Sequence, residues 1–482
     1  MPYKKSSIWS ALDWFSILLY ITMIISGWFS ICGASYEFEN VGWFNPSGRP
    51  GSQLIWIALS FVLIFIILMM DGNFFNVFAY AIYAIVVFVL ILTIFIAPDI
   101  KGSHSWLVLG PYLRIQPAEF AKFATALALA KFMSAYGFRL KSLKNYAIAL
   151  SLICFPFICI LLQKETGSAL IFMAFFLMLY REGMSGYVLL AGINAITFFV
   201  ISLKYSESIV GITPLGEMIT LGLVQIITVI LGCIVKPNSL QTKIFIGITV
   251  GTYTLAYIAS EFIPINFIWV TSGLLIGTIG GLIFLAIKNW IYNYLLVILF
   301  AGISVGFIYS VDYVFDKMLE PHQQTRIKVS LGLEDDPRGV GYNVNQSKIA
   351  IGSGGFLGKG FLNGTQTKLK YVPEQDTDFI FCTVGEEKGF MGSSIVIILF
   401  TIFIIRLYIL AEKQKTVFAR IYGYCVASIF FIHVLINIGM VTGITPVIGI
   451  PLPFFSYGGS SLWGFTLLLF IFLRLDATRK ER

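Results

Sequence analysis

Long apolar segments separated by polar links recur along most of the 482-residue chain. A helix needs about 20 apolar residues to cross a bilayer, and most of the segments approach that length. They are continuous rather than alternating, which disfavours an outer-membrane barrel. The pattern predicts fourteen membrane helices, near 11–31, 53–70, 74–97, 117–136, 146–162, 167–180, 186–203, 217–235, 243–260, 267–287, 292–313, 391–410, 418–440 and 459–474.

Composition and charge agree with a polytopic α-helical membrane protein. Charged residues make up 12% of the chain and hydrophobic residues 57%, whereas soluble domains carry about 25% charged residues. If all fourteen segments span, the Lys and Arg clusters of the links fall on one side, as the positive-inside rule requires. Both termini are therefore expected in the cytoplasm, and the net charge of +8 needs no nucleic-acid partner.

The interval 316–390 is the longest polar stretch, and this topology places it outside the cytoplasm. Roughly 75 residues are too many for a passive connector. Long loops on a rigid scaffold often carry function, so we expect chemistry here.

Acidic residues cluster near the end of this interval. Asp376 and Asp378 lie two residues apart, after Glu374 and directly before the apolar run 379–381. A carboxylate held against an apolar surface is poorly solvated, which suits a general base. An exposed acidic turn is the alternative interpretation.

Further charged residues interrupt the apolar segments. Glu119 and Lys122 are three apart and share one helix face, and ionised residues within a span mark function by default; a structural ion pair or a snorkelling lysine is the alternative. Glu165 breaks the pattern between two segments, where a helix N-cap turn is also typical. Trp106 fits an interfacial anchor.

Two glycine-rich segments complete the candidates. The segment 352–360 fails the Walker spacing, but its amides could hold a phosphate; a flexible turn is equally compatible. The segment 449–461 combines two prolines with three glycines, which predicts a broken segment at membrane depth, buried in protein or lining a cavity.

The last segment also carries a family resemblance. It reads Gly-Ile-Pro-Leu-Pro-Phe-Phe-Ser-Tyr-Gly-Gly-Ser-Ser and resembles the C-terminal signature of the SEDS proteins (shape, elongation, division, sporulation), with Phe454-Phe455 closer to the RodA branch. Three further segments resemble motifs of the same family and occur in the family's order. They are Gln-Pro-Ala-Glu-Phe-Ala-Lys at 116–122, Gln-Ser-x-Ile-Ala-Ile-Gly-Ser-Gly-Gly at 346–355 and Pro-Glu-x-x-Thr-Asp-Phe-Ile-Phe at 373–381.

The resemblance implies a peptidoglycan glycosyltransferase of cell elongation and rod shape. Such an enzyme moves the growing glycan chain from undecaprenyl diphosphate to the GlcNAc 4-hydroxyl of lipid II, at the outer face of the bacterial cytoplasmic membrane. Asp378 takes the place of the family's essential carboxylate. Supporting or substrate-binding roles are implied for Glu119, Lys122, Arg326, Glu165, Trp106 and Asp376.

Partners and cofactors follow from the same resemblance. It implies a class B penicillin-binding protein and other elongation proteins as partners. It also implies a divalent cation, Mg²⁺ or Mn²⁺, with Asp378 and Asp376 as candidate ligands, and no nucleotide. A lipid II flippase and a non-catalytic scaffold for the penicillin-binding protein stay as alternatives, because broken helices and buried charges also suit a transporter.

The chain departs from the family pattern at several positions. Asp376 replaces the usual His, Glu165 the usual Asp, and Ser105 an Arg that often precedes the Trp. The family has ten spans, so about four are extra. We expect 1–185 to form the first part of the core with about six helices, 186–290 to be inserted helices, and 291–482 to complete the core with the loop 316–390.

Overall fold

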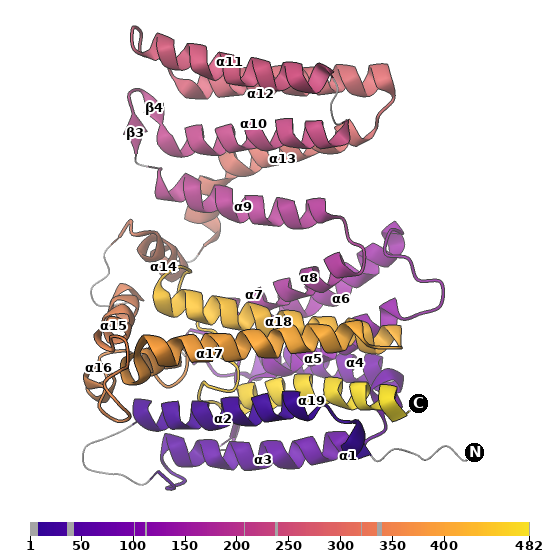
Figure 1. The fold of residues 1–482 in the computed structure, drawn as a ribbon, viewed down its shortest axis with the longest axis vertical. Helices are drawn as coiled ribbons and strands as arrows, with labels where there is room; N and C mark the ends of the chain where they lie inside the picture. Colours follow the sequence, from indigo (N-terminus) through magenta and orange to yellow (C-terminus); the bar gives the residue numbers. More distant parts are fainter. Residues whose placement is uncertain are drawn as a thin grey trace. The chain divides into compact units, whose positions relative to one another are not determined.

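The computed structural model describes residues 8–35, 43–100, 102–110, 113–206, 208–236, 240–319, 321–334 and 340–481, and these are almost entirely helical (Figure 1). The chain divides into two compact units, Met1–Ser185 with Pro337–Arg482, and Gly186–Asp336. The first unit therefore combines both ends of the chain.

Eight long helices build the first unit. They are α2 (Trp14–Ala34), α3 (Arg49–Met69), α4 (Gly72–Ile96), α5 (Pro117–Met133), α6 (Leu143–Leu162), α17 (Ile380–Glu412), α18 (Val417–Thr442) and α19 (Gly459–Glu481). Shorter elements are α1 (Ile8–Ala11), α7 (Thr166–Leu170), η1 (Ile171–Met173), α8 (Ala174–Arg181), α15 (Val340–Ser353), α16 (Thr365–Lys368) and a hairpin of β1 (Leu107–Leu109) and β2 (Leu113–Ile115).

Five long helices build the second unit: α9 (Gly186–Lys204), α10 (Leu215–Val235), α11 (Leu240–Ser260), α12 (Phe267–Asn289) and α13 (Asn293–Tyr313). The short pair β3 (Ile209–Val210) and β4 (Thr213–Pro214), the π-helical turn η2 (Val314–Met318) and α14 (Pro321–Leu331) complete it. Inside this bundle, Gln225 donates to Thr249 and accepts from Thr278. The boundaries 186–290 expected for the inserted helices stay a prediction.

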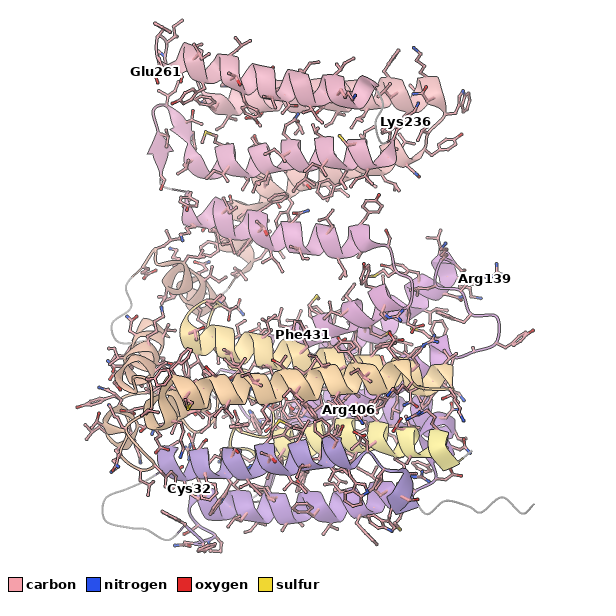
Figure 2. All side chains as sticks on the ribbon, in the orientation of Figure 1. Cys32, Arg139, Lys236, Glu261, Arg406 and Phe431 are labelled. Carbon is pink, nitrogen blue, oxygen red and sulfur yellow. The ribbon has the colours of Figure 1, made fainter. Side chains whose placement is uncertain are left out.

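All fourteen predicted apolar segments are helical. Within the described residues, twelve helices are long and apolar enough to cross a membrane. The other two segments are α5, which has 17 residues, and the shorter apolar stretch Thr166–Arg181. Large apolar side chains also project from the helices, as Phe431 does on α18 (Figure 2). The predicted all-α polytopic membrane fold is confirmed.

The centre of the first unit is made by α5, α18 and α19. In α18 and α19, 72% and 78% of the most apolar stretch is buried, against 22% in α3 and α4. Helix α5 packs on α4, α6, α18 and α19 and buries six alanines, at positions 118, 121, 124, 126, 128 and 130. These small side chains allow close approach: a Cβ at Gly464 of α19 would lie 3.1 Å from the Glu119 carbonyl oxygen. The charged pair of α5 is thus at the centre of the unit.

The interval expected as a long loop, 316–390, contains the helices α14, α15 and α16 and the start of α17. Its helix α15 buries Val344, Ser347 and Ala350 at three-residue intervals and packs on α17 and α18. A helix with one narrow apolar stripe and a polar remainder does not register as an apolar run. The interval therefore reads as a loop in the sequence.

Helix α17 is interrupted at Gly389, where φ is 65° and ψ is −160°. Few residues other than glycine adopt this region, and a Cβ here would lie 2.3 Å from the Gly358 amide nitrogen. After the break, the amides of Phe390 and Met391 donate to the carbonyls of Gly355 and Phe356. The glycine-rich segment is therefore joined to the interruption in α17.

Candidate functional site

The turn that carries Asp378 is fixed through its main chain. Three successive carbonyl oxygens, those of Asp376, Thr377 and Asp378, each accept one hydrogen bond from a residue of the C-terminal part of the chain. The donors are the Tyr457 amide (2.8 Å), the Ser456 hydroxyl (2.6 Å) and the Asn437 side-chain amide (2.8 Å). The backbone is thus held without using the Asp378 carboxylate.

The predicted broken segment lies directly against this turn. The chain between α18 and α19 is non-helical, and Asn437 also donates to the Ile450 carbonyl at 2.7 Å. Gly449 has φ of 78°, and a Cβ there would lie 3.3 Å from Asp378 Oδ2. The half-buried Asp378 carboxylate therefore faces Gly449, so two motifs from distant parts of the sequence form one site.

A buried charged cluster lies on α5. Lys122 Nζ donates to Glu119 Oε2 at 2.7 Å and lies 3.0 Å from His433 Nε2 of α18. Lys122 is 0% exposed, His433 1% and Glu119 2%. The lysine also lies 4.7 Å from the centroid of the Phe465 ring. Complete burial with every contact internal favours a supporting role for this cluster.

One face of α18 connects the cluster to the Asp378 turn. His433 and Asn437 are four residues apart and so are neighbours on the helix surface. His433 Nδ1 lies 3.4 Å from the Pro451 carbonyl, and Asn437 donates to the carbonyl of Ile450, one residue earlier. The lysine cluster, the broken segment and the Asp378 turn are therefore parts of a single packed arrangement.

Asp376 forms an ion pair with Arg49, the first residue of α3. The side chain of Asp376 is 6% exposed and that of Arg49 is 53% exposed. The family resemblance implies a supporting role for Asp376, or a role as a cation ligand. The Arg49 guanidinium offsets the charge of this carboxylate.

Two residues that depart from the family pattern, Ser105 and Glu165, contact each other. The Ser105 hydroxyl donates to Glu165 Oε2 at 2.9 Å. Glu165 stands just before α7, as the N-cap interpretation expected, without a side-chain cap bond. Trp106 is half-buried and directly precedes β1. The Ser–Glu pair thus fills the position where the family pattern has Arg and Asp.

Arg326 lies on α14 of the second unit and is half-buried. Its implied role toward the substrate stays a prediction.

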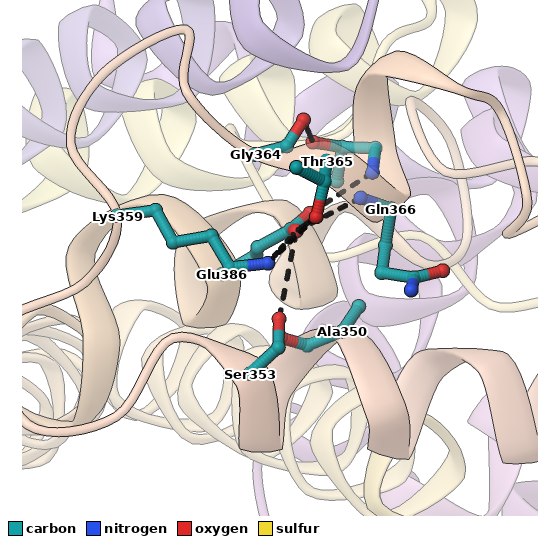
Figure 3. A network of polar contacts seen from close by, with 8 residues as sticks. Ala350, Ser353, Lys359, Gly364, Thr365, Gln366 and Glu386 are labelled. Atoms are coloured by element: carbon teal, nitrogen blue, oxygen red, sulfur yellow. Dashed lines mark hydrogen bonds and ion pairs between the residues drawn. The ribbon is translucent and has the colours of Figure 1, made fainter.

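The region between α15 and α17 is organised by the carboxylate of Glu386, which is 0% exposed (Figure 3). It accepts from Lys359 Nζ at 2.7 Å and from the amides of Gln366 and Thr367 at 2.9 Å each. The hydroxyls of Thr365 and Ser353 lie at 3.3 and 3.5 Å. Glu386 therefore ties the region before the Asp378 turn to α17.

The glycine-rich segment 352–360 is part of the same region. The amides of Lys359 and Gly360 donate to the carbonyls of Glu386 and Glu387 at 3.0 Å each, and that of Gly358 to Gly354 at 2.9 Å. These amides are satisfied within the protein. The phosphate-holding alternative therefore has no support at these three positions.

Arg49, His433, Asn437 and Glu386 were missed as site residues by sequence reasoning. Arg49 and Asp376 are 327 residues apart, and Lys122 and His433 are 311 apart. No local spacing could link such pairs. The sole signal was their residue type, since buried polar groups need partners.

Comparison with known proteins places this arrangement in a family. The model of the FtsW, RodA and SpoVE cell cycle proteins matches residues 13–215 and 269–481. The unmatched residues 216–268 fall inside the predicted insertion. The peptidoglycan glycosyltransferase RodA of Treponema pallidum is 29% identical over 85% of this chain and 86% of its own length. The peptidoglycan glycosyltransferase MrdB of Escherichia coli K12 is 47% identical over 30% of this chain and 39% of its own.

Solved structures share the fold. A protein from a peptidoglycan synthase complex superimposes with a TM-score of 0.60 at 23% identity, covering 97% of this chain and 98% of the other. The crystal structure of the rod shape determining protein RodA of Thermus thermophilus gives a TM-score of 0.55 at 19% identity, covering 98% of each chain. Because the family model matches most of the chain, this polytopic membrane protein belongs to the FtsW/RodA/SpoVE family of cell cycle proteins, the SEDS family.

Proposed function

We propose that this chain is a peptidoglycan glycosyltransferase in which Asp378 is the general base. It transfers the growing glycan from undecaprenyl diphosphate to the GlcNAc 4-hydroxyl of lipid II. The observation that carries the assignment is the Asp378 turn, in which three successive main-chain carbonyls each accept a hydrogen bond. The relatives named as peptidoglycan glycosyltransferases support it.

The geometry suits proton removal from a hydroxyl. A base must be held within hydrogen-bond reach of its proton, and its own position must be fixed by other contacts. Here the Tyr457 amide, the Ser456 hydroxyl and the Asn437 amide fix the main chain, while the Asp378 carboxylate stays half-buried beside Gly449. An acceptor hydroxyl would approach at this carboxylate, and the sugar bond to the diphosphate would break as the new bond forms, with inversion.

The roles of the other residues follow from their burial. Lys122, held by Glu119 and His433, is a positioning residue that fixes α18 and, through Asn437, the Asp378 turn. Glu165 and Trp106 would support substrate binding by shaping the surface around the β1–β2 hairpin and the start of α7. Arg326 is proposed to support the substrate, as the family resemblance implies.

A divalent cation would be held mainly by Asp378. Mg²⁺ is commonly bound by one or two carboxylates together with substrate phosphates. In the described part of the chain no three His, Cys, Asp or Glu side chains come together as a ligand set, and Asp376 is paired with Arg49. The residues thus fit a cation shared with the substrate, where it would neutralise phosphate charge.

We propose that both termini lie in the cytoplasm and that the Asp378 turn faces outward. The support is the distribution of Lys and Arg over the links. A class B penicillin-binding protein is the proposed partner, together with other elongation proteins. The similarity to a member of a peptidoglycan synthase complex, described as coordinating polymerization and crosslinking, supports that partner.

The test is lipid II polymerisation by the purified chain with its penicillin-binding partner. We expect Asp378→Asn to lower the rate by about 10²–10⁴-fold. The substitution keeps the bond from Asn437 to the turn, because that bond uses the Asp378 carbonyl. Asp99→Asn, at a carboxylate on an exposed turn, is the matched control. Full activity of the Asp378 variant would refute the assignment, and lipid II translocation without polymer would favour a flippase.

A further inference from the structure

Arg49 is an exposed cation beside the Asp378 turn that sequence reasoning did not single out. Its guanidinium pairs with Asp376, two residues before Asp378, and lies 5.7 Å from the centroid of the Tyr457 ring. Tyr457 donates its own amide to the Asp376 carbonyl at 2.8 Å. Asp376 therefore joins the arginine and the tyrosine to the turn that carries the base.

The two members of the ion pair differ in exposure. The Asp376 side chain is 6% exposed, whereas 53% of the Arg49 side chain is open to solvent. In the described part of the chain, the guanidinium uses one N–H donor for Asp376, and a guanidinium carries five. The buried carboxylate and the aromatic ring thus fix the orientation of a guanidinium whose side chain is about half open to solvent.

A guanidinium fixed in this way suits a phosphate group. Its planar fork matches phosphate oxygens bidentately, and such charge-assisted bonds are among the strongest that proteins form. Lys122, by contrast, is 0% exposed and cannot reach a ligand without rearrangement. Transfer from a lipid diphosphate requires positive charge at the leaving group.

We infer that Arg49 binds the diphosphate of a lipid-linked substrate, with Asp376 and Tyr457 as the residues that orient it. This inference rests on the proposed function, since both the growing chain and lipid II carry a diphosphate. A simple structural ion pair is the competing explanation. The two differ in whether the cation must stand at position 49.

The decisive experiment is a charge exchange. Arg49→Ala and Asp376→Ala should each lower the melting temperature, and the double variant Arg49→Asp/Asp376→Arg should restore part of it. Binding of undecaprenyl diphosphate, titrated in detergent, should be weakened about tenfold or more in Arg49→Ala and should stay weak in the exchanged variant. Recovery of diphosphate binding and polymerisation by the exchange would overturn the inference.

Kinetics distinguish the two sources of diphosphate. If Arg49 holds the growing chain, Arg49→Ala lowers kcat for lipid II polymerisation; if it holds lipid II, the variant raises KM. Arg49→Lys should recover part of either loss.

Arg181→Ala is the matched control, because Arg181 is 55% exposed and forms a surface pair with Glu412. Unchanged kcat, KM and diphosphate binding in Arg49→Ala, alongside an active wild type, would refute the inference alone; an inactive wild type would refute the proposed function.

Discussion

The side-chain amide of Asn437 lies 2.8 Å from the main-chain oxygen of Asp378 and 2.7 Å from that of Ile450. One residue of α18 thereby joins the turn before α17 to the broken segment before α19. Asn437 is 0% exposed, so water cannot replace it as a donor. The position of the base thus depends on a bond to its main chain from a residue of another helix.

The first prediction concerns that amide. Asn437→Asp replaces the donor with oxygen and leaves two buried carbonyls unsatisfied, each at a cost of about 1–3 kcal/mol. We expect kcat for lipid II polymerisation to fall at least about tenfold. Thr442→Val is the control, because the Thr442 hydroxyl bonds within α18. Equal activity of the two variants would contradict the positioning role.

The second prediction concerns the Glu119–Lys122 pair. Removing one partner of a buried pair costs about 3–5 kcal/mol, whereas replacing both can be nearly neutral. Lys122→Met should therefore lower the melting temperature strongly, and Glu119→Gln/Lys122→Met should recover much of the loss. Lys131→Met is the control on the same helix, because Lys131 is half-buried and donates to Asn76. Strictly additive effects of the two substitutions would exclude the coupling.

The third prediction concerns Glu386. Glu386→Gln keeps the volume but turns one acceptor oxygen into an NH₂ donor. Four groups donate to Oε1 and the Thr367 amide donates to Oε2, so in either orientation the new donor opposes an existing one. The expected loss of local stability is about 3 kcal/mol, seen as faster proteolysis within 353–370 and slower polymerisation. The control at the other end of α17 is Glu412→Gln, because its surface pair with Arg181 is worth about 0–1 kcal/mol. A protease-resistant, fully active Glu386→Gln protein would contradict the organising role.

The fourth prediction concerns pH and Asp13, the N-cap of α2. Burial alone would raise the pKa of Asp13, but hydrogen bonds from Arg406 and Ser16 outweigh it and hold the pKa below its ordinary value. The stabilisation is complete above the unfolded-state pKa of about 3.9 and is lost as the pH falls through the lower folded-state pKa. The difference in melting temperature between wild type and Asp13→Asn should therefore shrink on acidification below about pH 4. A difference that is constant from pH 7 to pH 3 would count against this ion pair.

The helices were predictable because the bilayer imposes a simple rule on sequence. An apolar run of adequate length satisfies its backbone only as a helix or a closed barrel, so all fourteen runs could be located without tertiary information. Helix α15 escaped the same reasoning, because its polar remainder faces away from the buried Val344 and Ala350. Hydropathy detects contact with lipid, and α15 is stabilised by contact with protein.

The site was predictable only in pieces. Glu119 and Lys122 are close in sequence and their pairing follows from helix geometry, as found at 2.7 Å. The segments 373–381 and 449–461 were each distinctive, but nothing in either indicated the bond between the Ser456 hydroxyl and the Thr377 carbonyl. Such contacts depend on how helices distant in sequence pack, which periodicity does not encode.

The interruption at Gly389 divides α17 into two parts, of which only the second needs to cross the membrane. A continuous helix of 33 residues would extend about 50 Å, well beyond the roughly 30 Å of hydrocarbon. The 23 residues after Gly389 extend about 34 Å and are long enough to cross the hydrocarbon by themselves. With the proposed orientation, the first part of α17 and the Asp378 turn would then lie in the headgroup layer. A polyprenyl-linked sugar could meet the base there with its tail still dissolved in the bilayer, and no energy would be spent on extracting the lipid.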